Sequence, residues 1–217
     1  MPTATLLRPA TDADISRLVT LNNAAIPAVP DTPAADMAEL LDVASLALVA
    51  VDPNSPADPL GFVVALESGE DWPGENYAWF EERGLDHLYV DRIVVGEGAR
   101  GRGIGQLFYD AVFDAARTAG HEVVTCEVNL NPPNPGSMRF HGRLGFEERG
   151  QQLTKGGDVL VAKLAADVGS AGADDAAGRA AKRRAATSRA TTTGTSRTGV
   201  PTIAPTGARA ALTTAAV

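Results

Sequence analysis

The most constraining feature of this 217-residue sequence is a glycine-rich hexapeptide, Arg100-Gly101-Arg102-Gly103-Ile104-Gly105. It follows residues 87–95, the strongest strand pattern of the chain, and it opens residues 103–119, whose apolar positions have helical spacing. A helix N-terminus offers unpaired N–H groups and a positive dipole, and glycine lets another molecule approach the main chain. The sequence therefore predicts an anion site, with Arg100 and Arg102 placed to pair with phosphate groups.

Two common phosphate-binding loops are excluded. A Walker loop ends in Gly-Lys-Ser or Gly-Lys-Thr, and neither tripeptide occurs in the chain. The dinucleotide fingerprint requires glycine at position 106 after those at 101 and 103, and Gln106 stands there. A plain strand–helix connection is the alternative explanation of this segment alone.

A second motif follows further along the chain. Asn134 is followed by Ser137, His141 and Gly145-Phe146, so that the serine lies three and the histidine seven residues later. Together with the glycine-rich hexapeptide, this spacing resembles the GNAT superfamily of acetyl-CoA-dependent N-acetyltransferases over residues 4–164. The resemblance implies an α/β (α+β) fold, in which helices flank a central mixed, mostly antiparallel sheet with a splayed strand pair that binds acetyl-CoA.

The resemblance also implies where acetyl-CoA binds. The opening is expected between the strand at 87–95 and the strand at 122–129, with pantetheine along the first strand and the pyrophosphate on the amides of 100–105. An N–H near Val94 is expected to polarise the thioester carbonyl, and no metal is expected. The residues expected to contact acetyl-CoA are Ile93, Val94, Val95, Arg100, Gly101, Arg102, Gly103, Ile104, Gly105 and Asn134.

His141 is the candidate proton donor. Acetyl transfer to an amine requires a neutral amine, a donor for the developing oxyanion and an acid for the departing thiolate. The acid of the family is commonly a tyrosine, and this sequence has His141 at that position. Imidazole titrates near neutral pH, so His141 is interpreted as an acid or base, with a binding role as the alternative. Tyr109 is interpreted as a packing residue.

Two carboxylates are candidates for the general base. Asp91 is expected to share a strand face with Tyr89 and Ile93, and Glu127 to share one with Asn129. Each has a structural alternative, because either carboxylate can serve in an ion pair and Glu127 can be solvated. Some family members deprotonate the amine through water alone, so the reaction does not require a base.

The chain is expected to divide at residue 165. Of its 19 Lys and Arg and its 27 Asp and Glu, residues 166–217 hold seven and three, so residues 1–165 carry a net charge of −12. Residues 166–217 are rich in Ala, Thr, Gly, Ser and Arg, a composition that predicts a disordered, low-complexity basic tail. The acidic part argues against nucleic acid as its own ligand and favours a cationic acceptor.

Residues 67–86 are expected to form a long acidic loop. The segment contains four aromatic residues, Trp72, Tyr77, Trp79 and Phe80, for which two interpretations are open. Either they attract a cationic amine by charge and cation–π contacts, or they pack locally beneath a solvated loop.

The sequence also bears on location. Residues 1–10 lack the basic region and apolar run of a signal peptide, and no apolar stretch approaches the roughly 18 residues that span a bilayer. A cytoplasmic protein without membrane association is expected. Cys126 is the single cysteine, which excludes an intramolecular disulfide and a thiolate metal cluster.

The other elements are expected in a fixed order. A strand at 4–8 precedes a helix that starts with a capping box at Thr11, and a second helix has Thr32 as its N-cap and Pro33 in its first turn. The remaining expected elements are a hairpin-like strand pair at 45–51 and 60–66, a helix at 135–144, a strand from 146 and a last strand at 159–164.

Three functions are compatible with these patterns. The first is an N-acetyltransferase that uses acetyl-CoA and a primary amine of a small molecule, peptide or protein. The second, the alternative to the first, is a non-catalytic acyl-CoA-binding regulatory module, which is considered because the tyrosine is missing. The third uses Lys182-Arg183-Arg184 as a nucleic-acid tether. The oligomeric state is open, with a homodimer as one option.

Overall fold

The computed structural model describes residues 4–169, which form a seven-stranded sheet and its flanking helices. The sheet has the order β1-β2-β3-β4-β5-β7-β6, and every neighbouring pair is antiparallel except β4–β5. The strands are β1 (Leu6–Pro9), β2 (Leu46–Val51), β3 (Gly61–Glu67), β4 (His87–Val95), β5 (Val123–Asn131), β6 (Glu147–Thr154) and β7 (Val159–Asp167). The mixed, mostly antiparallel sheet predicted from the sequence is confirmed.

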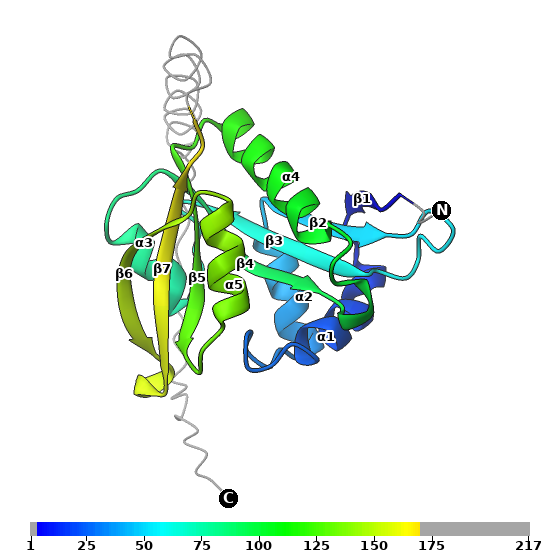
Figure 1. The fold of residues 1–217 in the computed structure, drawn as a ribbon, viewed down its shortest axis with the longest axis horizontal. Coiled ribbons are helices and arrows are strands. Elements are labelled where there is room, and N and C mark those ends of the chain that lie inside the picture. Colours follow the sequence, from blue (N-terminus) through cyan, green and yellow to red (C-terminus); the bar gives the residue numbers. More distant parts are fainter. Residues whose placement is uncertain (1–3, 170–217) are drawn as a thin grey trace, which may run out of the picture. The chain divides into compact units, whose positions relative to one another are not determined.

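Helices cover both faces of the sheet (Figure 1). One face carries α4 (Ile104–Ala119) and α5 (Pro135–Arg143), and the other carries α1 (Ile15–Asn23), α2 (Ala34–Val43) and α3 (Glu75–Glu81). Each face therefore has its own apolar core. The α4–α5 side is called the first core and the α1–α2–α3 side the second core.

The longest helix, α4, is bounded by glycines at both ends. Gly103 at its N-cap has φ 78° and Gly120 at its C-cap has φ 87°. Both angles are left-handed, a conformation that costs other residues about 1–2 kcal/mol. Between them Ile104, Phe108 and Val112 recur at helical spacing and are buried in the first core. The helix and its glycine C-cap are confirmed.

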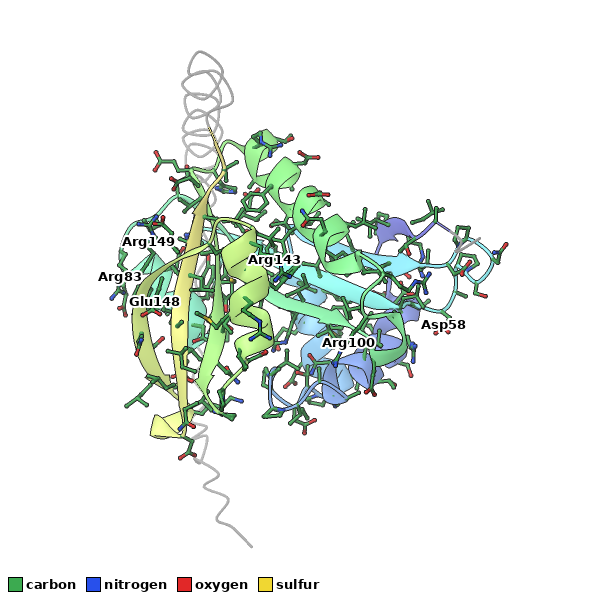
Figure 2. All side chains as sticks on the ribbon, in the orientation of Figure 1. Asp58, Arg83, Arg100, Arg143, Glu148 and Arg149 are labelled. Carbon is green, nitrogen blue, oxygen red and sulfur yellow. The ribbon has the colours of Figure 1, made fainter. Side chains whose placement is uncertain are left out.

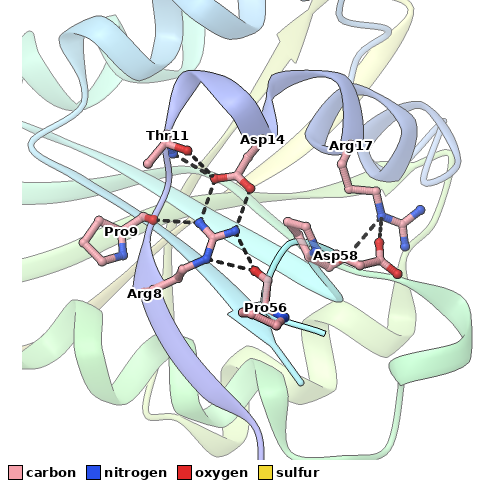
Figure 3. A network of polar contacts seen from close by, with 8 residues as sticks. Arg8, Pro9, Thr11, Asp14, Arg17, Pro56 and Asp58 are labelled. Carbon is pink, nitrogen blue, oxygen red and sulfur yellow. Dashed lines mark hydrogen bonds and ion pairs between the residues drawn. The ribbon is translucent and has the colours of Figure 1, made fainter. Parts of the chain in front are cut away.

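A polar network fastens the first strand to the rest of the domain (Figure 3). The guanidinium of Arg8 lies 2.7 Å and 2.8 Å from the two carboxylate oxygens of Asp14, and it also donates to the carbonyl oxygen of Pro56. Asp14 accepts the backbone N–H of Thr11 at 2.9 Å, which completes the capping box predicted there. The network thus joins β1, the start of the first helical segment and the β2–β3 loop.

The largest difference from the sequence prediction concerns residues 67–86. They contain the helix α3, whose Tyr77, Trp79 and Phe80 are buried in the second core. The guanidinium of Arg83 already lies 3.3 Å from the centre of the Trp79 ring. These three aromatic side chains are therefore core residues and not an open cage for a cationic amine.

The second helix begins one residue later than predicted. Pro33 is the N-cap of α2 and Ala34 its first residue. The hydroxyl of Thr32 donates instead to the carbonyl oxygen of Pro30 at 3.1 Å. Thr32 thus stabilises the preceding turn and does not cap the helix.

The last strand is longer than predicted. β7 continues to Asp167, and both Ala166 and Val168 are buried in the first core. The packed chain therefore crosses the boundary predicted at residue 165. Most of the predicted tail, including Lys182-Arg183-Arg184, lies outside the described residues. Within residues 4–169, no helix is both long and apolar enough to cross a membrane.

Candidate active site

The strands β4 and β5 separate soon after they begin (Figure 1). Their parallel pairing joins residues 87–89 to residues 123–125 and goes no further. Beyond that point β4 stays paired only with β3, and β5 only with β7. The opening predicted between these two strands is therefore present.

A β-bulge lies in β4 where the strands separate. Val64 of β3 pairs with Arg92, whereas the next residue, Ala65, pairs with Val90. Asp91 is thus an additional residue with no direct partner in β3.

The bulge changes which face each later side chain of β4 occupies. Side chains alternate along a regular strand, and one additional residue reverses the alternation. Tyr89 is buried in the second core, whereas Ile93 packs against the first. The prediction that Ile93 shares a face with Tyr89 and Asp91 is therefore wrong. On β5, by contrast, Glu127 and Asn129 share a face as predicted, because Val128 between them belongs to the first core.

Beyond the bulge, the backbone of β4 presents two residues to the opening. The N–H of Gly96 donates to the carbonyl oxygen of Leu60 at 2.9 Å. Since every second residue of an antiparallel strand faces the same partner, Val94 also directs its backbone groups to β3. Those of Ile93 and Val95 are directed to the edge that β5 leaves free. Val94 is therefore unsuited to the backbone contacts predicted for it, and its two neighbours are suited to them.

A cleft of about 890 Å³ occupies the opening. It is lined by every residue predicted to contact acetyl-CoA except Arg102, and by the three predicted catalytic residues His141, Asp91 and Glu127. Two arginines are among the lining residues: Arg100, in the segment before α4, and Arg143, in α5 (Figure 2). Residues 27–30, in the α1–α2 loop, also line the cleft and were not predicted, because no motif marks them.

The glycine segment fits a phosphate-bearing ligand. Gly101 and Gly103 have φ angles of 76° and 78°, and a Cβ added to either would meet nothing within 4 Å. Among the described residues, no side chain caps the N-terminus of α4 by a hydrogen bond. The main chain is therefore accessible to an anion at the positive end of this helix.

Asn134 has a structural role at the start of α5. Its Oδ1 accepts the backbone N–H of Ser137 at 3.1 Å, and Pro135 occupies the first helical position. The Asn-x-x-Ser spacing of the second motif is thus that of a capped helix.

His141 is buried, and both of its ring nitrogens are engaged. Nδ1 lies 2.8 Å from the carbonyl oxygen of Ser137, and Nε2 lies 2.7 Å from Oη of Tyr109. A carbonyl oxygen only accepts, so Nδ1 carries the hydrogen and the Tyr109 hydroxyl donates to Nε2. Burial also lowers the pKa of His141. A neutral imidazole in this arrangement offers no proton to the cleft, so the geometry does not support His141 as the acid.

A smaller cavity of about 180 Å³ adjoins the cleft. Both are lined by residues 27–30, Asp91, Arg92, Glu127 and Asn129, so they meet at the bulge of β4 and the middle of β5. The smaller cavity is further lined by Trp72, Asn76, Tyr89 and Lys155. Two molecules, one in each cavity, would meet beside Glu127.

The surroundings of Glu127 raise the pKa of its carboxyl group. The hydroxyl of Tyr89 donates to its Oε2 at 2.7 Å. Burial, and after it the charge of Asp91, raises the pKa of Glu127 to about 7, while Lys163 and Arg92 oppose the rise. A carboxylate with this pKa accepts and releases protons near neutral pH.

Asp91 is held by partners of its own. Its Oδ1 lies 2.5 Å from a guanidinium nitrogen of Arg92, and its Oδ2 accepts the indole N–H of Trp72 at 3.2 Å. Burial raises the pKa of Asp91, and Arg92 opposes the rise. Because both carboxylate oxygens are engaged, the geometry favours the ion-pair alternative for Asp91 over the role of base.

Residues 17–146, more than half of the chain, match the model of the acetyltransferase (GNAT) family. The chain belongs to the GNAT family of acetyltransferases. A curated phosphinothricin N-acetyltransferase from Streptomyces coelicolor is 40% identical to this GNAT protein over 58 residues, which are 27% of this chain and 33% of that relative. The chain thus matches about a third of the length of this curated relative.

Solved structures agree with this GNAT fold. Ard1 from Thermoplasma volcanium superimposes with a TM-score of 0.62 at 16% identity, over 77% of this chain and 100% of that one. YncA from Salmonella typhimurium, described as a putative acetyltransferase with its cofactor acetyl-CoA, gives a TM-score of 0.57 at 17% identity, over 79% and 98%. In the described part of this GNAT protein, no group of three or more His, Cys, Asp or Glu is arranged to hold a metal ion.

Proposed function

We propose that this GNAT protein transfers the acetyl group of acetyl-CoA to a primary amine. The observation that carries the proposal is the meeting of the large cleft and the small cavity at Glu127. A two-substrate transfer needs the donor and the acceptor in contact at a group that can accept a proton, and Glu127 lies at that junction.

The large cleft suits the donor. The amides from residue 100 to residue 105 would hold the pyrophosphate at the N-terminus of α4, and the free backbone groups of Ile93 and Val95 would hold the pantetheine. Acetyl-CoA supplies a reactive thioester as the acyl donor. A backbone N–H of β4 beyond the bulge would stabilise the carbonyl oxygen as negative charge develops on it.

Glu127 performs the proton transfer in this proposal. Its carboxylate takes a proton from the acceptor ammonium, and the neutral amine forms a bond to the carbonyl carbon. The carbon–sulfur bond then breaks, the sulfur leaves as a thiolate, and the extra proton on the nitrogen passes to solvent. The hydroxyl of Tyr89 holds Glu127 in place. The conjugate acid of the departing thiolate is an ordinary thiol, with a pKa of about 8.5, so the reaction does not depend on an acid at His141.

The small cavity suits the acceptor. Its volume of about 180 Å³ accommodates a small amine or the end of a longer one. Its lining combines the carboxylates of Asp91 and Glu127 with the cations of Arg92 and Lys155, so it favours a polar acceptor. The cytoplasmic location stays a prediction, the nucleic-acid tether stays an alternative, and the oligomeric state stays open.

The test is turnover with a panel of amines. The full chain is mixed with acetyl-CoA and with amines of several classes, including polyamines, amino acids and peptides. Free CoA is measured with a thiol reagent, and the acetylated product by mass spectrometry. We expect at least one amine to release CoA well above the hydrolysis background in the wild type and not in Glu127→Gln. If acetyl-CoA binds but no class of amine releases CoA, the non-catalytic acyl-CoA-binding module replaces this proposal.

A further inference from the structure

Lys163, in the middle of β7, is buried completely although it carries an ammonium group. Its Nζ lies 2.5 Å from Oδ1 of Asn76 and 5.9 Å and 5.7 Å from the ring centres of Trp79 and Phe80. None of the ion pairs formed within residues 4–169 includes it. The ammonium is thus held by an amide and two aromatic faces.

This placement is costly for the fold. A buried ammonium without a bonded carboxylate loses its hydration and regains only part of it from an amide and from cation–π contacts. Burial accordingly lowers the pKa of Lys163 to about 8. An apolar side chain would suit this position better, because it faces the rings of Trp79 and Phe80. Packing alone therefore does not explain the charge at this position.

The register of the sheet supplies an explanation. Glu127 of β5 is the direct partner of Lys163 in β7. Directly opposed residues of an antiparallel pair project to the same side, with Cβ atoms about 4.5–5.5 Å apart. Glu127 lines both the cleft and the small cavity, whereas Lys163 lines neither. The ammonium of Lys163 can therefore act on Glu127 without contacting a molecule bound in either space.

The other charges around Glu127 do not replace Lys163. From β4, Tyr89 and Asp91 face Glu127, and the charge of Asp91 opposes its ionisation. Arg92 favours ionisation but is bonded to Asp91. From β7, Lys163 is the facing cation that is not committed to another carboxylate. Lys163 also interacts with two charged residues of the α3 region: Glu75 raises the pKa of Lys163, and Arg83 lowers it.

We propose that Lys163 is a positioning residue whose buried ammonium keeps Glu127 in the ionised form that accepts the proton of the acceptor amine. The inference rests on the role of Glu127 proposed above. Lys163 touches neither substrate in this arrangement. It balances the negative charge of Asp91, which would otherwise keep the Glu127 carboxyl protonated near neutral pH.

The titration of Glu127 tests the inference without any substrate. The full chain is labelled with ¹³C at glutamate side-chain carboxyls, and the Glu127 signal is assigned by its loss in Glu127→Gln. Lys163→Met removes the charge, and Lys163→Gln removes the charge but keeps a donor for Asn76. We expect the pKa of Glu127 to rise by about one unit or more in both variants. In the rate, the rise of kcat/KM with pH should move upward by the same amount.

A reciprocal measurement covers the case in which the Lys163 variants do not fold. Because the coupling acts equally on both partners, Glu127→Gln should lower the pKa of Lys163, measured by ¹⁵N NMR of its ammonium. An unchanged titration of Glu127 in a folded Lys163 variant, or of Lys163 in Glu127→Gln, overturns the inference. Absence of acetyl transfer in the wild type would instead contradict the proposed function, and the titrations would still be interpretable.

Discussion

Gly105 of α4 lies against the ring of Phe140 of α5: a Cβ added to Gly105 would be 3.0 Å from Cζ of that ring. Both helices contribute residues to the lining of the large cleft. We expect Gly105→Val to lower the free energy of unfolding by about 1–3 kcal/mol, since the added side chain would overlap the ring of Phe140. Thermal and denaturant unfolding would measure the loss.

The matched control for this change is Gly98→Ala, whose added Cβ would meet nothing within 4 Å. It should unfold like the wild type. Adding Phe140→Leu to Gly105→Val should recover part of the stability. Wild-type stability of Gly105→Val by itself would show that the helices are not in close contact.

Gly103 should be essential for donor binding and not only for folding. We expect Gly103→Ala to reduce the acetyl-CoA-dependent rise in melting temperature, because its added Cβ obstructs the main chain at the anion site. Gly84→Ala is the strain control, since Gly84 also has a positive φ, 64°, with nothing within 4 Å of its added Cβ. Both variants should lose about 1–2 kcal/mol of stability, and only Gly103→Ala should lose the ligand effect. Equal ligand effects would refute the phosphate assignment.

Glu127→Gln should reduce kcat by a factor of roughly 10²–10⁴, the range of general base catalysis. Its amide can still accept the hydrogen bond from Tyr89, so folding should be preserved. In the wild type, kcat/KM should increase as the pH rises through about 7, where the Glu127 carboxylate forms. Steady-state kinetics from pH 5.5 to about pH 9 would show this increase and its absence in the variant. A variant with wild-type kinetics would exclude Glu127 as the base.

His141→Phe should affect stability and leave the pH profile of kcat/KM unchanged in shape. Without Nε2, the buried hydroxyl of Tyr109 loses its acceptor, which costs about 1–3 kcal/mol. The double variant Tyr109→Phe with His141→Phe removes that unpaired hydroxyl and should recover part of the loss. Disappearance of a kinetic pH limb in His141→Phe would restore His141 as the proton donor.

The same substitution should weaken the acid dependence of stability. Burial lowers the pKa of His141 in the folded state, so the unfolded chain binds the proton more readily. The contribution of neutral His141 to the free energy of unfolding is complete above the unfolded-state pKa of about 6.5, and it is lost as the pH falls toward the lower folded-state pKa. The slope for one such histidine is at most about 1.4 kcal/mol per pH unit. Unfolding of the wild type and of His141→Phe across this range measures the difference.

The elements with strong local patterns were predictable from the sequence. Gly103, the apolar stripe of α4 and Gly120 define that helix by themselves, and the alternation of residues 123–129 puts Glu127 and Asn129 on one face. Local propensity and periodicity suffice there, because packing only reinforces them.

Features that depend on tertiary contacts were not predictable. α3 has seven residues, too short a segment for helical periodicity to be recognised, and it forms because Tyr77 and Phe80 are buried against the sheet. The contacts of His141 and the role proposed for Lys163 depend on Tyr109 and Glu127, which are distant in sequence. Spacing indicated His141 as a candidate site residue but did not reveal that both of its nitrogens are engaged.

The bulge at Asp91 decides which backbone groups of β4 are left free along the cleft. If β4 continued past Val90 without the bulge, Asp91 would pair with Val64, and Ile93 would pair with Phe62. The backbone groups of Ile93 and Val95 would then turn toward β3, while Val94 would face the open edge. The same amino-acid sequence without this one-residue shift in pairing would therefore lose the edge that the proposed donor needs.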